Sequence, residues 1–338
     1  MPPAAQQPIE RIAVIGAGAW GTALATVARR AGRMVDLWAR EPDIAATIAA
    51  KRENVVYLPG IAIDAAISVT NDLVGAVGDA EAILLVVPAQ HLRAVVREIA
   101  AVSSSQAPIV ICAKGIERGT LKLMSEVVAE CLPDARLAAL SGPTFAAEVA
   151  RGLPTAVTLA SDDAELGQRL AAAIGTATFR PYLGDDLIGA QIGGAVKNVI
   201  AIACGIVEGR GLGENAGAAL MTRGLAEIMR LGAALGAKRD TLMGLSGLGD
   251  LSLTCNSEQS RNMSLGIALG RGWSLEHAVA AKPSIAEGVA SAESVSDLAA
   301  KLGVDMPIVN SVDGILHHFA DLDATIAALL ARPFKQES

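Results

Sequence analysis

The sequence has few aromatic residues and no excess of positive charge. Phe, Trp and Tyr make up 3% of the 338 residues, and 28 Lys and Arg stand against 35 Asp and Glu, for a net charge of -7. Proteins that bind nucleic acids normally present a basic surface to the phosphates and aromatic side chains to the bases. Neither feature is present, so we expect no nucleic-acid partner.

Cysteine is equally scarce. Cys112, Cys131, Cys204 and Cys255 stand far apart and form no CxxC pair or Cys/His cluster. Disulfide frameworks and zinc sites both need such clusters. We therefore expect free structural thiols, no bound metal and a reducing, cytoplasmic location.

We also expect neither a signal peptide nor a membrane-spanning helix. Residues 1–9 lack the basic and then apolar segments of a signal peptide, so we expect a short disordered tail there. Residues 188–207 are apolar enough to cross a bilayer, but Lys197 would lie near its midplane, where a charge costs about 2.5–3.5 kcal/mol. We expect no membrane insertion.

At 338 residues the chain is longer than one hydrophobic core usually sustains, so we expect two domains, and a hydrophobic fraction of 52% is ample for burial. Apolar runs of strand length alternate with helical patterns up to about residue 185, and only helical patterns follow. Such alternation predicts parallel strands with helices on both faces. The fold class is therefore α/β, with a Rossmann-type dinucleotide-binding domain over residues 10–185 and an all-helical substrate domain over residues 186–335.

The segment VIGAGAWG carries a GxGxxG fingerprint, Gly16, Gly18 and Gly21, after a predicted strand and at the start of a helix, and we assign Ala19 and Trp20 within it to the cofactor site as well. In this motif the glycines permit a tight turn, close approach of a pyrophosphate and close packing of helix on strand. The N–H groups at the start of the helix then face the anion. The alternative is a glycine-rich turn without a ligand.

The choice of nucleotide is read at the end of the second strand, MVDLWAR. An acidic residue there binds the ribose 2′-hydroxyl and disfavours a 2′-phosphate. Here the run ends in Arg40, and Asp36 stands in mid-strand. We expect NADPH to be accepted, with NADH as the alternative.

One lysine, Lys197, interrupts the apolar segment of residues 186–209, and Asn198 follows it. In a helix, Gly193 and Gly194 lie one turn before Lys197 on the same face, and each costs about 1 kcal/mol relative to Ala. We expect something to lie close against the helix beside the ammonium group, and apolar surroundings to lower its pKa toward proton exchange with a substrate hydroxyl. The alternative is a surface helix with the amine in water.

Two further segments end predicted strands. Lys114 follows one strand, and the turn of residues 141–144 with Glu148 follows another. Because carboxyl ends of strands in open α/β sheets face the ligand crevice, we expect both to line one cleft, the alternative being solvated loops.

The helical half contains Ser260, Arg261 and Asn262 before an apolar run. Ser260 can cap that helix, and its free amides with Arg261 form a compact anion site suited to a phosphate. The alternative is a simple helix cap with an exposed arginine.

Together these segments closely resemble the bacterial-type NAD(P)-dependent glycerol-3-phosphate dehydrogenases over residues 10–330. The matching segments are GAGAWGTALA, WAR, VPAQHLR, AKGIE, SGPTFAAE, KNVIAIACGI, GLGDLSLTC, SRN and AEGV. The resemblance implies reversible hydride transfer between NAD(P)H and dihydroxyacetone phosphate, giving sn-glycerol 3-phosphate for glycerophospholipid synthesis. It also implies a helical domain like the C-terminal domain of 6-phosphogluconate dehydrogenase.

The resemblance assigns roles to individual residues. It implies that Lys197 is the proton acceptor and that Lys114 contacts both cofactor and substrate, while Asn198 orients the substrate or Lys197. The implied substrate contacts are Gly142, Thr144, Asp250, Ser260, Arg261 and Asn262. The implied cofactor contacts beyond the fingerprint are Trp20, Arg40, Ala146, Arg261, Ile285 and Glu287.

Two rival functions stay open from the residues. A 2-hydroxyacid or sugar-acid dehydrogenase with the same two-domain plan would act on carboxylates, and a non-catalytic NADPH-binding regulator would bind nucleotide without turnover. The Ala-rich helical domain could also form a homodimer contact.

Overall fold

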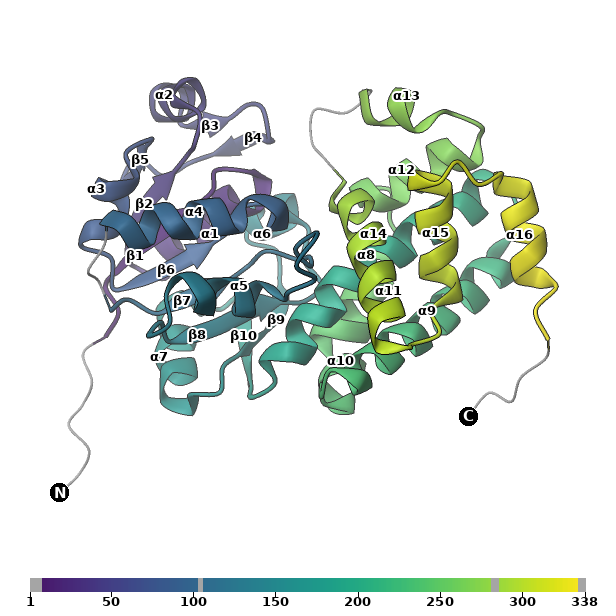
Figure 1. Cartoon of the computed structure of the whole chain (residues 1–338). Coiled ribbons are helices and arrows are strands. Elements are labelled where there is room, and N and C mark those ends of the chain that lie inside the picture. The colour runs from purple at the N-terminus through teal and green to yellow at the C-terminus, as the bar shows by residue number, and fades with distance from the viewer. Residues whose placement is uncertain (1–7, 103–105, 281–285, 334–338) are drawn as a thin grey trace.

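The computed structural model describes residues 8–102, 106–280 and 286–333, and its α/β and helical parts lie side by side (Figure 1). The predicted fold class is confirmed. The last strand ends at Gly184 and the first helix of the helical part begins at Leu187, whereas the domain limits themselves stay a prediction. The predicted tail falls mostly on residues outside the described chain, but Ile9 is 2% exposed and packs into the core.

The α/β part is built on an eight-stranded sheet in the order β10-β9-β8-β7-β6-β1-β2-β5. This order places β1 inside the sheet, between β6 and β2, where the strand order reverses. The strands are β1 (Arg11–Ile15), β2 (Met34–Trp38), β5 (Ile67–Thr70), β6 (Ala82–Leu85), β7 (Ile109–Ile111), β8 (Leu137–Ser141), β9 (Thr155–Ala160) and β10 (Phe179–Gly184).

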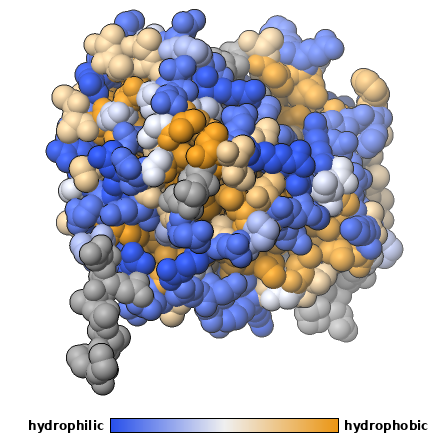
Figure 2. All heavy atoms as spheres, turned by 60° about the vertical axis from the view of Figure 1, so that its left-hand side comes forward, coloured by the Kyte–Doolittle hydropathy of each residue, from blue (hydrophilic) through white to orange (hydrophobic). Residues whose placement is uncertain are grey.

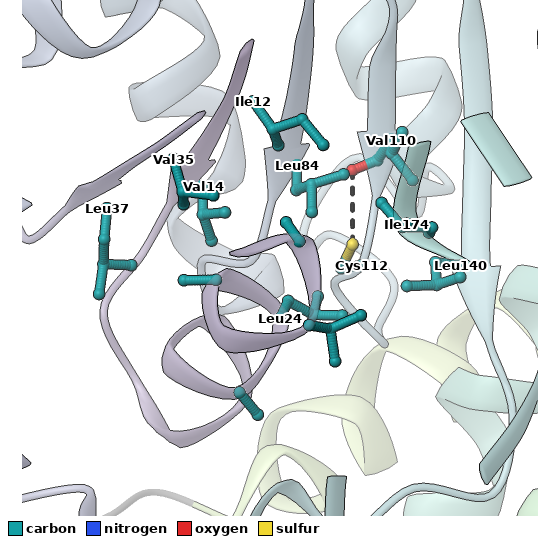
Figure 3. Packing of buried hydrophobic residues seen from close by; sticks show 14 of the residues in the cluster. Ile12, Val14, Leu24, Val35, Leu37, Leu84, Val110, Cys112, Leu140 and Ile174 are labelled. Atoms are coloured by element: carbon teal, nitrogen blue, oxygen red, sulfur yellow. Dashed lines mark hydrogen bonds between the residues drawn. The ribbon is translucent and has the colours of Figure 1, made fainter. Parts of the chain in front are cut away.

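Alternation along the strands divides the core of this part into two layers. Ile12 and Val14 of β1 belong to one buried cluster, and Ala13 and Ile15 belong to another on the opposite face. Figure 3 shows the first cluster, in which Leu24 of α1 lies against the sheet. The helices of this part are α1 (Ala19–Arg30), α2 (Pro42–Lys51), α3 (Leu73–Gly78), α4 (Ala89–Val102), α5 (Met124–Cys131), α6 (Ala146–Arg151) and α7 (Ala164–Ile174).

The strands of the main sheet depart from the predicted parallel pairing at one place, because β8 and β9 are antiparallel. The connection between them, residues 142–154, contains only the six-residue helix α6. A parallel crossover needs a connection of about a dozen residues or more, usually with a longer helix, so this connection is at the lower limit. The chain therefore re-enters the sheet from the end at which β8 leaves it.

The sequence patterns also did not reveal a small antiparallel hairpin. Strands β3 (Glu53–Asn54) and β4 (Leu58–Ala62) pair with each other outside the main sheet. β3 has only two residues, and β4 contains Pro59 and Gly60, so neither shows the pattern of a strand. On the face of the molecule in Figure 2, polar residues cover much of the surface and leave smaller hydrophobic areas between them.

The helical part is organised around α8 (Leu187–Gly209), whose residues from Gly189 to Ile206 are all buried. Within the described chain it is the one helix long and apolar enough to cross a membrane, and 94% of its most apolar window is buried inside the protein. Its composition is thus explained by its central position. The other helices are α9 (Glu214–Ala234), α10 (Arg239–Met243), the π-helix η1 (Leu245–Gly249), α11 (Asp250–Cys255), α12 (Arg261–Gly270), α13 (Leu275–Ala280), α14 (Glu287–Leu302), α15 (Pro307–His317) and α16 (Leu322–Leu330).

All four cysteines carry free thiols, as expected. Cys112, Cys204 and Cys255 are buried, and Cys131 is half-buried at the end of α5.

Candidate active site

The glycine fingerprint forms the turn between β1 and α1. Gly16 has a φ of +118°, and a Cβ there would lie 2.9 Å from the carbonyl oxygen of Val86. A Cβ at Gly21 would lie 1.7 Å from the oxygen of Gly16, whereas one at Gly18 would meet no described atom within 4 Å. The turn is therefore closed on its inner side and open beside Gly18, at the helix N-terminus where a pyrophosphate can approach.

Arg40 lies just beyond β2, and its side chain is exposed. Asp36, in mid-strand, forms an ion pair with Arg11, since its Oδ2 atom lies 3.2 Å from Nη1 of that residue. Its carboxylate is thus already paired on β1, and the residue that stands at the tip of β2 is basic.

Lys197 lies in the middle of α8 and is 6% exposed, which excludes the alternative of an amine in water. Its Nζ atom donates to Oδ1 of Asp250 at 2.5 Å and to Oγ1 of Thr254 at 2.9 Å. Asp250 and Thr254 are one turn apart on α11, so a single helix face receives the ammonium group.

Lys114 reaches the same carboxylate from the α/β part. It follows β7, and its Nζ atom donates to Oδ2 of Asp250 at 2.7 Å and to the carbonyl oxygen of Gly142 at 3.2 Å. Asp250 is completely buried. One carboxylate therefore binds two ammonium groups at the junction of the two parts of the chain.

The electrostatics of Lys197 follow from this arrangement. Burial lowers its pKa from the ordinary 10.5 to about 8, the charge of Asp250 opposes the shift, and the ammonium group of Lys114 adds to it. The direction agrees with the expectation from the sequence. At this pKa the amine can both release and accept a proton near neutral pH.

The two glycines before Lys197 are explained by the protein itself. A Cβ at Gly193 would lie 2.3 Å from the carbonyl oxygen of Ser246 in η1, and one at Gly194 would lie 3.0 Å from Oγ of Ser141 and 3.2 Å from Cγ of Lys114. Something does lie close against the helix, but it is the backbone that leads to Asp250 and the stem of the second lysine. The glycines permit the two lysines and the carboxylate to meet.

A chain of amides lies one residue further along α8. Oδ1 of Asn198 accepts a hydrogen bond of 2.9 Å from Nδ2 of Asn262, and Oδ1 of Asn262 accepts one of 3.0 Å from the backbone N–H of Gly288. Three helices, α8, α12 and α14, are thereby held together beside the lysines.

The expected cap of α12 is present. Oγ of Ser260 accepts from the backbone N–H of Met263 at 3.2 Å, and Arg261, the first residue of the helix, is exposed. Burial raises the pKa of Glu287 at the start of α14, and the nearby charges of Arg261, Lys114 and Lys197 oppose the shift. Glu287 therefore lies within electrostatic reach of three cations.

The turn after β8 completes the junction. Gly142 has a φ of +145°, and its carbonyl oxygen accepts from Oγ1 of Thr144 at 3.2 Å as well as from Lys114. Ala146 is the first residue of α6. Ile285 lies outside the described residues.

The structure thus brings Lys114, Gly142, Lys197 and Asp250 into direct contact, and Asn198 into contact with Asn262. The fingerprint and Arg40 lie elsewhere, at the carboxyl ends of β1 and β2. Thr254 was missed by the sequence analysis. The available signal was its position four residues after Asp250 in a predicted helix.

Comparison with known proteins gives a consistent result. The chain matches the family models described as NAD-dependent glycerol-3-phosphate dehydrogenase N-terminus, over residues 11–167, and C-terminus, over residues 186–327. It is 58% identical to a glycerol-3-phosphate dehydrogenase [NAD(P)+] of Caulobacter vibrioides, with 97% of this chain and 99% of that protein covered. The corresponding protein of Parvibaculum lavamentivorans is 57% identical, with 97% and 98% covered.

A solved structure is similar over the same length. The crystal structure of glycerol-3-phosphate dehydrogenase from Coxiella burnetii has a TM-score of 0.93 and 40% sequence identity, and the match covers 96% of this chain and 99% of that one. Both parts of the chain are therefore present in these similar proteins, in the same order.

Proposed function

Because the chain belongs to the NAD-dependent glycerol-3-phosphate dehydrogenase family, we propose that Lys197, Lys114 and Arg261 perform the family's reaction at the junction of its two parts. The activity is reversible hydride transfer between NAD(P)H and dihydroxyacetone phosphate, which gives sn-glycerol 3-phosphate. The single observation that carries the assignment of residues is the buried carboxylate of Asp250, which binds both lysines.

Lys197 is the residue that exchanges the proton. Its Nζ atom is buried, and its pKa of about 8 leaves it mostly protonated at neutral pH. When bound, the nicotinamide supplies the hydride to the C2 carbonyl carbon of the substrate. Lys197 then gives a proton to the alkoxide oxygen, and in the reverse direction its neutral form takes that proton back.

Lys114 and Asp250 support this step in different ways. The ammonium group of Lys114 stabilises negative charge that develops on the C2 oxygen. Asp250 has no exposed surface and each of its oxygens accepts from one lysine, so we assign Asp250 to positioning the lysines rather than to direct binding of the substrate hydroxyls. Its negative charge also raises the pKa of Lys197, so the amine stays protonated to a higher pH than it would without Asp250.

The phosphate of the substrate binds at the start of α12. Arg261 is exposed there, the first N–H groups of a helix have no partner within the helix, and Ser260 satisfies that of Met263. Asn198 and Asn262 hold this helix against α8. Gly142 and Thr144, which adjoin Lys114, are assigned to further substrate contacts. A phosphate fixed there holds the carbonyl carbon at hydride distance.

The cofactor fits the turn between β1 and α1. The open side of Gly18 admits its diphosphate, with Gly16, Ala19 and Gly21 forming the turn. Trp20 fits this role too, because its buried Nε1 atom has no hydrogen-bond partner among the described residues. Arg40 binds the 2′-phosphate of NADPH. Ala146 and Glu287 are assigned to further cofactor contacts, as is Ile285, which lies outside the described residues.

Steady-state kinetics tests the function. Initial rates are measured by loss of nicotinamide absorbance, with NADPH and NADH in parallel and with dihydroxyacetone phosphate or a 2-keto acid. We expect turnover of the phosphorylated triose and faster turnover with NADPH. Turnover of the keto acid alone would favour a 2-hydroxyacid dehydrogenase, and nucleotide binding without turnover would favour a regulator.

We further propose a cytoplasmic homodimer that supplies glycerophospholipid synthesis and is not inserted into the membrane. Support comes from the burial of α8 and from apolar surface on the helical part, where Phe319 is 99% and Leu330 81% exposed. Light scattering on the purified protein measures the mass, and a monomer at micromolar concentration would contradict the dimer.

A further inference from the structure

The β3–β4 hairpin sends one buried side chain into the dinucleotide-binding turn. Asn54 is 1% exposed, and its Nδ2 atom donates to the carbonyl oxygen of Ala17 at 2.9 Å and to Oγ1 of Thr22 at 2.8 Å. Ala17 stands between the first two glycines of the fingerprint, and Thr22 is the fourth residue of α1. Asn54 thus bridges the turn and the helix that the turn opens.

All the donors of this amide are used. Both N–H groups of Nδ2 are engaged, and Oδ1 accepts from the backbone N–H of Tyr57 at 3.1 Å, which closes the hairpin on itself. A buried amide with every donor satisfied has one orientation, because each alternative leaves a polar group unpaired. The position of Asn54 relative to Ala17 is therefore well defined.

The contact with the Ala17 carbonyl has a consequence for the next residue. In a trans peptide the C=O of one residue and the N–H of the following residue point in opposite directions across a rigid plane. None of the peptide bonds in the described part of the chain is cis, so this rule applies to the Ala17–Gly18 peptide. When Asn54 draws the oxygen of Ala17 toward itself, the N–H of Gly18 is turned the opposite way, away from the hairpin.

Gly18 is the residue at which this direction matters. It is the N-cap of α1, and a Cβ there would meet no described atom within 4 Å, so an anion has room to approach. A backbone N–H at a helix N-terminus contributes to anion binding only when it points at the anion.

We propose that Asn54 is a positioning residue for the cofactor, which fixes the Ala17–Gly18 peptide so that the N–H of Gly18 faces the diphosphate. The inference rests on the proposed cofactor site. It adds a residue outside the glycine fingerprint to the machinery that binds the nucleotide.

The test compares Asn54→Ala with Thr22→Val as a matched control. Asn54→Ala releases the Ala17 carbonyl, whereas Thr22→Val removes the other partner of Nδ2 and leaves that carbonyl bound. Both leave a buried group unsatisfied, so both lower stability. We expect Asn54→Ala to raise the Kd and KM for NADPH about tenfold, with kcat at saturating NADPH and the KM for dihydroxyacetone phosphate within twofold. Thr22→Val should leave the Kd within twofold.

The Kd is measured by the fluorescence of NADPH on the isolated enzyme, so it does not depend on turnover. If the wild type binds NADPH but does not reduce the triose phosphate, the proposed function fails while this test is still decided. A Kd within twofold of wild type in Asn54→Ala, or an equal loss in Thr22→Val, would overturn the proposal.

Asn54→Asp keeps the shape of the side chain and provides a second variant if the alanine variant does not fold. Its carboxylate can accept from Tyr57 and from the hydroxyl of Thr22 but cannot donate to the Ala17 oxygen. We expect the Kd for NADPH to rise at least tenfold, because the Ala17 oxygen loses its donor in this variant as well. An unchanged Kd contradicts the proposal.

Discussion

Nζ of Lys197 lies 2.5 Å from Oδ1 of Asp250, and that carboxylate has no exposed surface. Charges buried in this way are stable only when paired, and Asp250 is paired twice, once with each lysine. Because one lysine comes from each part of the chain, the pairing joins the two parts at the point where the reaction is proposed to occur.

Removal of the Lys197 ammonium should abolish most turnover. Lys197→Ala is expected to lower kcat about 100-fold to 10,000-fold, since it deletes the general acid, while the Kd for NADPH stays near that of wild type. The matched control is Lys301→Ala, which removes an exposed lysine from the last turn of α14. Retained turnover in Lys197→Ala would remove this residue from the mechanism.

The pH dependence should report Lys197 with opposite signs in the two directions. Reduction needs the protonated amine, so kcat/KM for dihydroxyacetone phosphate should fall as the pH rises through about 8. Oxidation needs the neutral amine, so kcat/KM for sn-glycerol 3-phosphate should rise over the same interval. Profiles measured from pH 6 to pH 10 in both directions check this.

Asp250→Asn should move that transition. The charge of Asp250 raises the pKa of Lys197, so its loss should shift the fall in the reductive direction to lower pH. The side chain keeps nearly the same shape, which separates the charge from the packing. An unchanged midpoint, or a shift to higher pH, would show that Asp250 does not set the protonation of Lys197.

Arg261→Ala should affect the phosphorylated substrate more than the cofactor. A hydrogen bond to a charged group contributes about 1.5–3 kcal/mol, so the KM for dihydroxyacetone phosphate should rise about tenfold or more. Arg271→Ala, at the other end of the same helix, is the control and should leave both KM values near wild type. A larger rise in the KM for NADPH would place Arg261 at the cofactor instead.

Gly193→Ala should lower both activity and stability, although Gly193 is assigned no contact with substrate or cofactor. Its Cβ would overlap the carbonyl oxygen of Ser246, so η1 and the Asp250 that follows it must move. We expect kcat to fall at least about tenfold and the unfolding free energy to fall by about 1–3 kcal/mol, measured by urea denaturation.

The control for that variant is Gly217→Ala in α9, where a Cβ would meet no described atom within 4 Å. Replacing this helical glycine should leave kcat unchanged and raise stability by up to about 1 kcal/mol. Equal effects of the two substitutions would mean that the glycine at 193 has no special packing role.

Much of the fold was readable from the sequence because its signals are local. The fingerprint, the strand and helix alternation and the long helical half each depend on periodicity or on glycine placed within a few residues. The antiparallel pairing of β8 with β9 was not readable, because the length of α6 and its position beside the sheet decide the direction in which the chain returns.

The sequence by itself determined that Lys197 would be an ammonium group in apolar surroundings with glycines beneath it. Only the tertiary structure decided what fills that space, because Ser246, Asp250 and Lys114 come from segments far apart in the chain. The same is true of Asn54, which no local pattern connects with Ala17. Long-range contacts between single polar groups have no periodicity, so they are defined only when the packed backbone brings the partners together.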